Sequence, residues 1–358
     1  MEKKYTAALV GTGRIGFTLG FDRKREQPAS HTFALKQNRR IKIVGGVDVD
    51  RERLEAWQKC NKGASVFDTV SGMFAAVQPD IVTVAVNEDA HLETALEVIS
   101  HKPQLLILEK PVALNMEQAD MIKKSSEENS VPVLVNHERR FAFDYNIARE
   151  YISKIGVVQR IRANLFSGLR VYDPAEESSG TYSLLHDGTH LVDIVLFMLE
   201  EIKSLSPEND GGKNYVRLTD PVYSGIYFDK EKKNTVRNFT ANYATPFCPD
   251  VSISISGRSR FFGFELDIIG TEGRICIGNG FHKFYSRKES KLYTGFYSLE
   301  EDRSVCIPGK TGYFSNMIQN AVDFLDGKCP LKSDLQTGIN ALEILEDIKN
   351  GLKKKLRP

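Results

Sequence analysis

Residues 5–16 read Tyr-Thr-Ala-Ala-Leu-Val-Gly-Thr-Gly-Arg-Ile-Gly, an apolar run that passes directly into a Gly-x-Gly-x-x-Gly motif. The run Ala7–Val10 predicts a buried strand, and the residues after the second glycine can begin a helix. In such a unit Gly11 permits the tight turn, Gly13 lets the backbone approach a pyrophosphate, and Gly16 lets the helix pack closely. The alternative is an ordinary strand-to-helix turn. The preceding strand favours a dinucleotide site at the helix start.

The composition is typical of a globular protein with two domains. The chain has 358 residues, and a single domain usually has about 100 to 200. It contains 48 Lys and Arg against 47 Asp and Glu, a balance that argues against a nucleic acid partner. The five cysteines are scattered and form no Cys-x-x-Cys pair, which is typical of reduced thiols. Because no apolar run approaches the roughly 20 residues of a membrane span, we expect a soluble cytoplasmic protein with no membrane partner.

In the first part of the chain, short apolar runs alternate with helical patterns, as in parallel βαβ units. Besides the first strand, the predicted strands are 41–48, 80–86, 105–109 and 131–135, and the predicted helices lie near 50–60, 69–76, 89–100 and 115–129. Asp68 or Thr69 can cap the second of these helices, and Asn115 can cap the last. The charged stretch 20–30 interrupts the pattern. The first helix should therefore stop near Leu19, and a second short helix should begin at His31. The stretch between them either lies near the dinucleotide or is a solvated insertion without a role.

After residue 137 the pattern changes to alternating strands in succession. The predicted helices are 141–154, 180–199, 313–326 and 334–354, and the predicted strands are 156–165, 223–229, 236–243, 251–256, 262–269 and 273–278. Strands without helices between them indicate an antiparallel sheet. The predicted fold class is an α/β Rossmann domain, residues 1–136, followed by an α+β domain, residues 137–358, with a large open, mainly antiparallel sheet. The last helix can pack back on the first domain.

Asp48 ends the predicted strand 41–48, where a carboxylate can accept both hydroxyls of the adenosine ribose and repel a 2′-phosphate. This position favours NAD over NADP as the cofactor. Arg51 and Arg53 follow closely and can accommodate a phosphate, so NADP remains possible. The structural alternative is that Asp48 caps the helix that begins near residue 50.

Glu109-Lys110-Pro111 stands at the end of the predicted strand 105–109. In a doubly wound sheet the carboxyl ends of the strands face the ligand crevice, so Lys110 is placed to meet whatever the nicotinamide meets. Considered by its chemistry alone, Lys110 is a surface lysine at a strand end.

A third polar group lies in the predicted helix 180–199. His186, His190 and Asp193 fall on one helical face, and Asp187 can reach His190 from three positions away. An imidazole beside a carboxylate is suited to moving the proton of an alcohol. His-x-x-x-His is also found in zinc sites, but the sequence offers no third ligand and we predict no metal. Alternatively, these residues are polar groups satisfied between a helix and a sheet, which suits Asp193 better than His190.

Together these stretches resemble the Gfo/Idh/MocA family, the group of glucose-fructose oxidoreductase and inositol dehydrogenase. The resemblance covers nearly the whole chain. It rests on the glycine motif and on four further segments: Glu109-Lys110-Pro111, Gly188-x-His190-x-x-Asp193, Asn136-His137-Glu138-Arg139-Arg140-Phe141 and Ile268-Ile269-Gly270-Thr271-Glu272-Gly273.

The resemblance implies an NAD(P)-dependent dehydrogenase or reductase of a sugar, cyclitol or nucleotide sugar, assembled as a homodimer or homotetramer. Lys110 would polarise the substrate hydroxyl or carbonyl, His190 would be the general acid/base, and Arg140 would lie near the active cleft and contact the substrate. Separately from the resemblance, Tyr172 lies in a stretch that can line the substrate pocket. The cofactor would be contacted by Gly11, Gly13, Arg14, Ile15, Gly16, Asp48, Asn87, His91, Glu109 and Lys110.

The chain departs from the family pattern four residues before the catalytic histidine, where many members carry Asp and this sequence has His186. Asp187 can contact His190 from the adjacent position, or His186 can take part in the proton relay. Two further functions therefore stay open. One is an NAD-requiring glycosidase or eliminating enzyme, which would turn over without net NADH, and the other is a regulatory protein that binds NAD(H) without chemistry.

Overall fold

The computed structural model describes residues 2–206 and 215–356, and these form two compact units. The first unit contains Met1–Ala142 and Lys310–Ile339, and the second contains Phe143–Gly309 and Asn340–Pro358. The predicted division differs, because it assigned everything after residue 136 to the second domain. As a statement about independently folding domains, the prediction stays a prediction.

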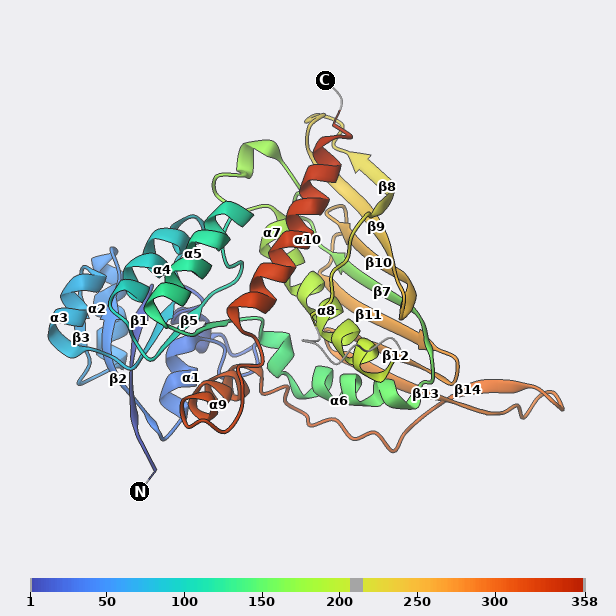
Figure 1. The fold of residues 1–358 in the computed structure, drawn as a ribbon, viewed down its shortest axis with the longest axis horizontal. Coiled ribbons are helices and arrows are strands. Elements are labelled where there is room, and N and C mark those ends of the chain that lie inside the picture. Colours follow the sequence, from blue (N-terminus) through green and yellow to red (C-terminus); the bar gives the residue numbers. More distant parts are fainter. Residues whose placement is uncertain (1, 207–214, 357–358) are drawn as a thin grey trace. The chain divides into compact units, whose positions relative to one another are not determined.

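The first unit is built on a six-stranded sheet in the order β3-β2-β1-β4-β5-β6 (Figure 1). All neighbouring strands are parallel, and this order is that of a Rossmann fold. The strands are β1 Tyr5–Val10, β2 Ile41–Val47, β3 Ser65–Phe67, β4 Ile81–Val84, β5 Leu105–Leu108 and β6 Val133–Val135. Only the three-residue β3 was absent from the predicted set. The α/β part of the predicted fold class is confirmed.

Three helices of the first unit, α2, α3 and α5, begin at a residue whose side chain caps them. The Thr69 hydroxyl accepts the amide of Gly72, and the Asn115 side chain accepts the amide of Gln118, so both predicted caps are confirmed. The helices of this unit are α1 His31–Gln37, α2 Arg51–Cys60, α3 Val70–Val77, α4 His91–Ser100, α5 Met116–Asn129 and α9 Tyr313–Leu325, with short 3-10 turns η1 Thr18–Phe21, η2 Glu88–Ala90 and η3 Glu138–Phe141.

The helix predicted directly after Gly13 does not form. The chain instead makes irregular turns and the short η1, because Phe17 has φ −143° and ψ −60°, outside the helical region. The Phe17 ring is buried and contacts the rings of Phe21 and Phe33, so side-chain packing competes here with helix formation. The predicted second helix at His31 is confirmed as α1.

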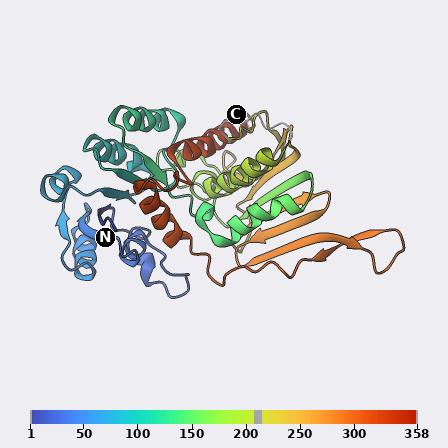
Figure 2. The ribbon, with the colours of Figure 1, turned by 60° about the horizontal axis from the view of Figure 1, so that its bottom comes forward.

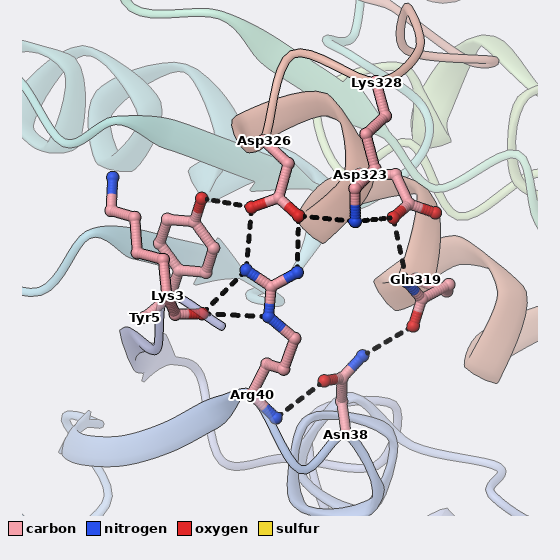
Figure 3. A network of polar contacts seen from close by, with 8 residues as sticks. All are labelled: Lys3, Tyr5, Asn38, Arg40, Gln319, Asp323, Asp326 and Lys328. Carbon is pink, nitrogen blue, oxygen red and sulfur yellow. Dashed lines mark hydrogen bonds and ion pairs between the residues drawn. The ribbon is translucent and has the colours of Figure 1, made fainter. Parts of the chain in front are cut away.

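A polar network fastens the returning segment Lys310–Ile339 to the start of the sheet (Figure 3). The Asp326 carboxylate accepts hydrogen bonds from the Tyr5 hydroxyl at 2.8 Å and from two nitrogens of Arg40 at 2.5 and 2.7 Å. Lys328 lies 2.8 Å from the same carboxylate. The hydrogen bonds from Arg40 and then Lys328 hold the pKa of Asp326 well below its usual range. These contacts therefore hold the returning segment against the start of β1 and the residue that precedes β2.

The second unit is built on an eight-stranded sheet in the order β14-β13-β12-β11-β7-β10-β9-β8. Only the β7–β10 pair is parallel, so the predicted open, mainly antiparallel sheet is confirmed. The strands are β7 Val158–Phe166, β8 Val222–Phe228, β9 Val236–Thr245, β10 Cys248–Ser256, β11 Gly263–Gly270, β12 Gly273–Gly278, β13 Phe281–Glu289 and β14 Tyr297–Glu301. The sequence reading missed the last two, which form a hairpin that extends beyond the rest of the sheet (Figure 2).

Helices cover one face of this sheet (Figure 2). They are α6 Phe143–Tyr151, α7 Ser183–His186, α8 Gly188–Leu205 and the later part of α10 Leu335–Lys353. The single helix predicted over 180–199 is instead two helices that meet at Asp187, and the second continues to Leu205. In the described part of the chain, no helix is both long and apolar enough to cross a membrane.

Candidate active site

The glycine turn after β1 has the shape of an anion cradle. Gly11 has φ +95°, and a Cβ there would lie 2.5 Å from the carbonyl oxygen of Ala85. A Cβ on Gly16 would lie 2.1 Å from the carbonyl oxygen of Gly11. Both positions therefore require glycine. A Cβ on Gly13 would meet only a guanidinium nitrogen of Arg53, at 3.9 Å, so this side of the turn is open.

The amides of the turn are available to a ligand. Among the hydrogen bonds of the described residues, the N–H groups of Gly13, Arg14, Ile15 and Gly16 donate to no protein acceptor. Successive unpaired amides of this kind bind phosphate oxygens. The first amides of α1 do not serve this purpose, because those of His31 and Thr32 donate to the carbonyls of Ile15 and Gly16. A phosphate bound here would therefore meet the turn itself and not the start of α1, and the residues of the turn fit a dinucleotide.

Asp48 holds this turn against the end of β2. Its Oδ2 accepts the amide of Thr12 at 2.6 Å and the hydroxyl of Thr12 at 2.8 Å, and its Oδ1 accepts the amide of Asp50 at 2.9 Å. The alternative that Asp48 caps α2 is wrong, because Asp50 caps it by accepting the amides of Glu52 and Arg53. A carboxylate has about four acceptor positions, so Asp48 keeps little capacity for ribose hydroxyls.

Glu109 follows β5 and is the centre of a buried polar cluster. Its Oε1 lies 2.6 Å from Nε2 of His31 and 2.6 Å from Nδ2 of Asn136, and its Oε2 accepts the amide of Lys110 at 3.3 Å. Burial alone would raise the pKa of Glu109, but the hydrogen bond and charge of His31, the charge of Lys110 and the Asn136 amide lower it to about 2. Glu109 is therefore an ionised carboxylate inside the unit.

His91 joins the loops that follow β4 and β5. Its Nδ1 lies 2.7 Å from the carbonyl oxygen of Pro111 and its Nε2 3.3 Å from that of Val86. The side chain is 1% exposed, and this burial lowers the pKa of His91. A neutral imidazole carries one N–H group, so it can donate to only one of these two carbonyls, and the shorter contact assigns the donor to Nδ1. His91 therefore ties the start of α4 to the loop after β5 that carries Lys110 and Pro111.

The stretch Gly20–Ser30 has a structural role, so the alternative of a solvated insertion without one is wrong. The carboxylate of Glu26 accepts the amide of Thr311 at 2.8 Å, its hydroxyl at 3.0 Å and the amide of Gly312 at 2.7 Å. These amides precede α9, so Glu26 anchors the insertion to the returning segment. The sequence offered no signal for this long-range cap.

The predicted proton-transfer residues lie in the second unit. Asp187 stands at the junction of α7 and α8, and its carbonyl accepts the amide of His190 at 3.1 Å. His186, Asp187 and His190 are partly exposed, whereas Asp193 is buried at 1% exposure. The side chains of the first three therefore face a partly solvated region near the start of α8, while Asp193 belongs to the core of the unit.

Two predicted substrate residues are buried. Tyr172 is 0% exposed and donates its hydroxyl to Glu177, which also pairs with Lys353 at 2.7 Å. Burial raises the pKa of Tyr172. This placement argues against the predicted substrate contact of Tyr172. Arg140 is 1% exposed within the first unit, and its role stays a prediction.

In the part of the chain that the structure describes, no three His, Cys, Asp or Glu side chains come close enough to hold a metal ion.

Comparison with known proteins decides the family. Residues 5–137 match the GFO_IDH_MocA family, an oxidoreductase family with an NAD-binding Rossmann fold. The chain belongs to the Gfo/Idh/MocA family of oxidoreductases. It is 26% identical over 251 residues to glucose-6-phosphate 3-dehydrogenase of Bacillus subtilis (strain 168), a match that covers 66% of this chain and 71% of the relative. It is 23% identical over 289 residues to scyllo-inositol 2-dehydrogenase (NAD⁺) of the same organism, covering 77% and 78%.

Solved structures share the fold of this Gfo/Idh/MocA oxidoreductase. A dehydrogenase from Chromobacterium violaceum superposes with a TM-score of 0.77 at 16% identity, covering 98% of this chain and 96% of the other. The WlbA dehydrogenase from Bordetella pertussis, solved with NADH and UDP-GlcNAcA, gives a TM-score of 0.70 at 17% identity, covering 99% and 97%. These likenesses confirm the predicted two-part fold. The family match and the open glycine turn identify an NAD-binding oxidoreductase.

Proposed function

We propose that this oxidoreductase transfers a hydride between nicotinamide and a hydroxyl or carbonyl group of a sugar, cyclitol or nucleotide sugar. The observation that carries the proposal is the ionised, buried Glu109 directly before Lys110 at the carboxyl end of β5, the edge at which doubly wound sheets bind ligands. The curated relatives are a sugar phosphate dehydrogenase and a cyclitol dehydrogenase, which supports this substrate class.

The amides of the glycine turn would bind the pyrophosphate, and the loops after β4 and β5, with Asn87 and Glu109, would lie against the nicotinamide half. The nicotinamide, when bound, supplies the hydride acceptor or donor. Lys110 would place its ammonium group against the substrate oxygen and stabilise the charge that develops there, an interaction that strengthens in the transition state.

His190 would accept the hydroxyl proton during oxidation and return it during reduction, and Asp187 or His186 would orient its ring. The chain would work in the cytoplasm as a homodimer or homotetramer. NAD is the cofactor that we propose as preferred, with NADP accepted more weakly.

Replacement of Lys110 tests this proposal. Lys110→Met keeps the length of the side chain and removes its charge, so kcat should fall on the order of 100-fold or more while NADH affinity stays nearly constant. Lys124→Met is the matched control, because Lys124 is a 77% exposed lysine on α5. Equal losses of turnover and NADH affinity in Lys110→Met would contradict the role of Lys110. Turnover without net NADH in the wild type would instead indicate the glycosidase or eliminating reaction.

A further inference from the structure

The insertion ends by placing a buried histidine against the carboxylate that precedes Lys110. His31 is the first residue of α1 and is 0% exposed, and Glu109 is 4% exposed. Nε2 of His31 lies 2.6 Å from Oε1 of Glu109. An ionised carboxylate only accepts hydrogen bonds, so Nε2 must carry the hydrogen and donate it. The pair is a charge-assisted contact between α1 and the end of β5.

We propose that His31 is a positioning residue for Lys110, acting through Glu109. The proposal rests on the proposed function, which gives Lys110 its contact with the substrate. Glu109 accepts His31 and Asn136 on Oε1 and the amide of Lys110 on Oε2. Since one carboxylate spans these contacts, the orientation of the backbone at Lys110 depends on the donors that hold Glu109 in place.

The cluster depends on donors from three elements. His31 comes from α1, Asn136 follows β6, and Lys110 follows β5. His91 of α4 is also within the electrostatic reach of Glu109. The ring of Phe314 on α9 packs edge-on against His31, with centroids 5.1 Å apart, so an apolar wall covers the histidine. Water cannot readily replace a donor that is lost here, and a partly satisfied buried carboxylate is costly.

The insertion explains why a histidine reaches this point. The chain makes no regular helix after the glycine turn, and α1 begins only after Ser30. The amide of His31 donates to the carbonyl of Ile15 at 3.1 Å, while its ring bonds Glu109. A single residue therefore connects the proposed phosphate turn to the proposed catalytic loop. The insertion itself is anchored independently through Glu26.

Three substitutions test the proposal in the full-length protein. His31→Leu removes the donor, His31→Gln can return an N–H group to the same place, and Glu26→Gln weakens the anchor of the insertion without touching Glu109. For each we would measure kcat, the Kd of NADH by fluorescence, and the rate at which an amine-reactive reagent labels Lys110, followed by peptide mass spectrometry. If His31→Leu does not fold, Asn136→Leu takes its place, because it removes the other donor to Oε1 of Glu109.

We expect His31→Leu to lower kcat on the order of 100-fold, the scale of a misplacement of about 1 Å, with a much smaller change in the Kd of NADH. The acid limb of its pH profile should move to higher pH, because Glu109 loses a donor and protonates more readily. Labelling of Lys110 should change relative to the exposed Lys124. His31→Gln should recover most of kcat and the pH profile, and Glu26→Gln should lower only thermal stability.

Equal activity losses in the leucine and glutamine variants, or unchanged Lys110 labelling in His31→Leu, would overturn the proposal. The labelling measurement needs no turnover. If the wild type oxidises no substrate, the proposed function fails, and the response of Lys110 labelling to His31→Leu still decides whether His31 positions it.

Discussion

The buried carboxylate of Glu109 should stabilise the fold only while it is charged, and Glu109→Gln isolates that contribution. Its pKa is about 2 where 4.5 is ordinary, and this difference corresponds to about 3 kcal/mol in favour of the ionised form. The folded-state pKa is lowered, so the stabilisation is fully present above the unfolded pKa near 4.5 and is lost as pH falls toward 2. At pH 7 Glu109→Gln should therefore lower the free energy of unfolding by about 3 kcal/mol.

Urea unfolding of both proteins at pH 7 and at pH 3.5 measures this contribution. The difference in the free energy of unfolding between wild type and Glu109→Gln should narrow from about 3 kcal/mol at pH 7 to about 2 kcal/mol at pH 3.5, because the unfolded wild type takes up a proton at the lower pH. Glu128→Gln is the matched control, since this glutamate is 62% exposed and lies 3.9 Å from Lys124; it should cost less than about 1 kcal/mol at either pH. A gap for Glu109→Gln that is small at pH 7, or that widens at pH 3.5, would refute the reasoning.

Four further substitutions test other parts of the first unit. Asp326→Asn removes the charge that fastens the returning segment and should lower the thermal midpoint, with the difference from wild type shrinking as pH falls toward the folded-state pKa. Gly16→Ala should disrupt folding or abolish NADH binding, whereas Gly13→Ala should fold normally and weaken only NADH binding, as calorimetry would show. Asp48→Asn should reduce the preference for NAD⁺ over NADP⁺ and loosen its contact with Thr12; an unchanged ratio of the two affinities would mean that Asp48 serves only the turn.

Local patterns predicted most of the architecture. Short apolar runs predicted five of the six parallel strands. The helix caps Thr69 and Asn115 could also be predicted, because each accepts an amide only three residues further along the chain. The short β3 and the hairpin β13–β14 were missed. Most side chains of β13 and β14 are exposed, so they lack the alternation that marks a half-buried strand.

The candidate site was predictable only where a motif is contiguous. The glycine turn and the position of Lys110 directly after β5 were predicted in this way, while the role of Lys110 stays a prediction. The contacts of Glu109 with His31 and Asn136 join residues 78 and 27 positions apart, and no periodic pattern reports such a pairing. Tyr172 was predicted as a pocket residue from its place along the chain alone, yet its ring is buried and packs against Tyr182. The break between α7 and α8 at Asp187 was not predicted, because His186, His190 and Asp193 have the spacing of a continuous helix.

The most direct test of the central claim is NADH formation by the purified protein with NAD⁺ and a panel of cyclitols, hexoses, sugar phosphates, uronic acids and nucleotide sugars, with Lys110→Met assayed in parallel. The account predicts net NADH with at least one of these alcohols, lost in Lys110→Met although that variant still binds NADH. NADH formation that survives in Lys110→Met, or tight NAD⁺ binding without turnover of any member of the panel, would contradict it.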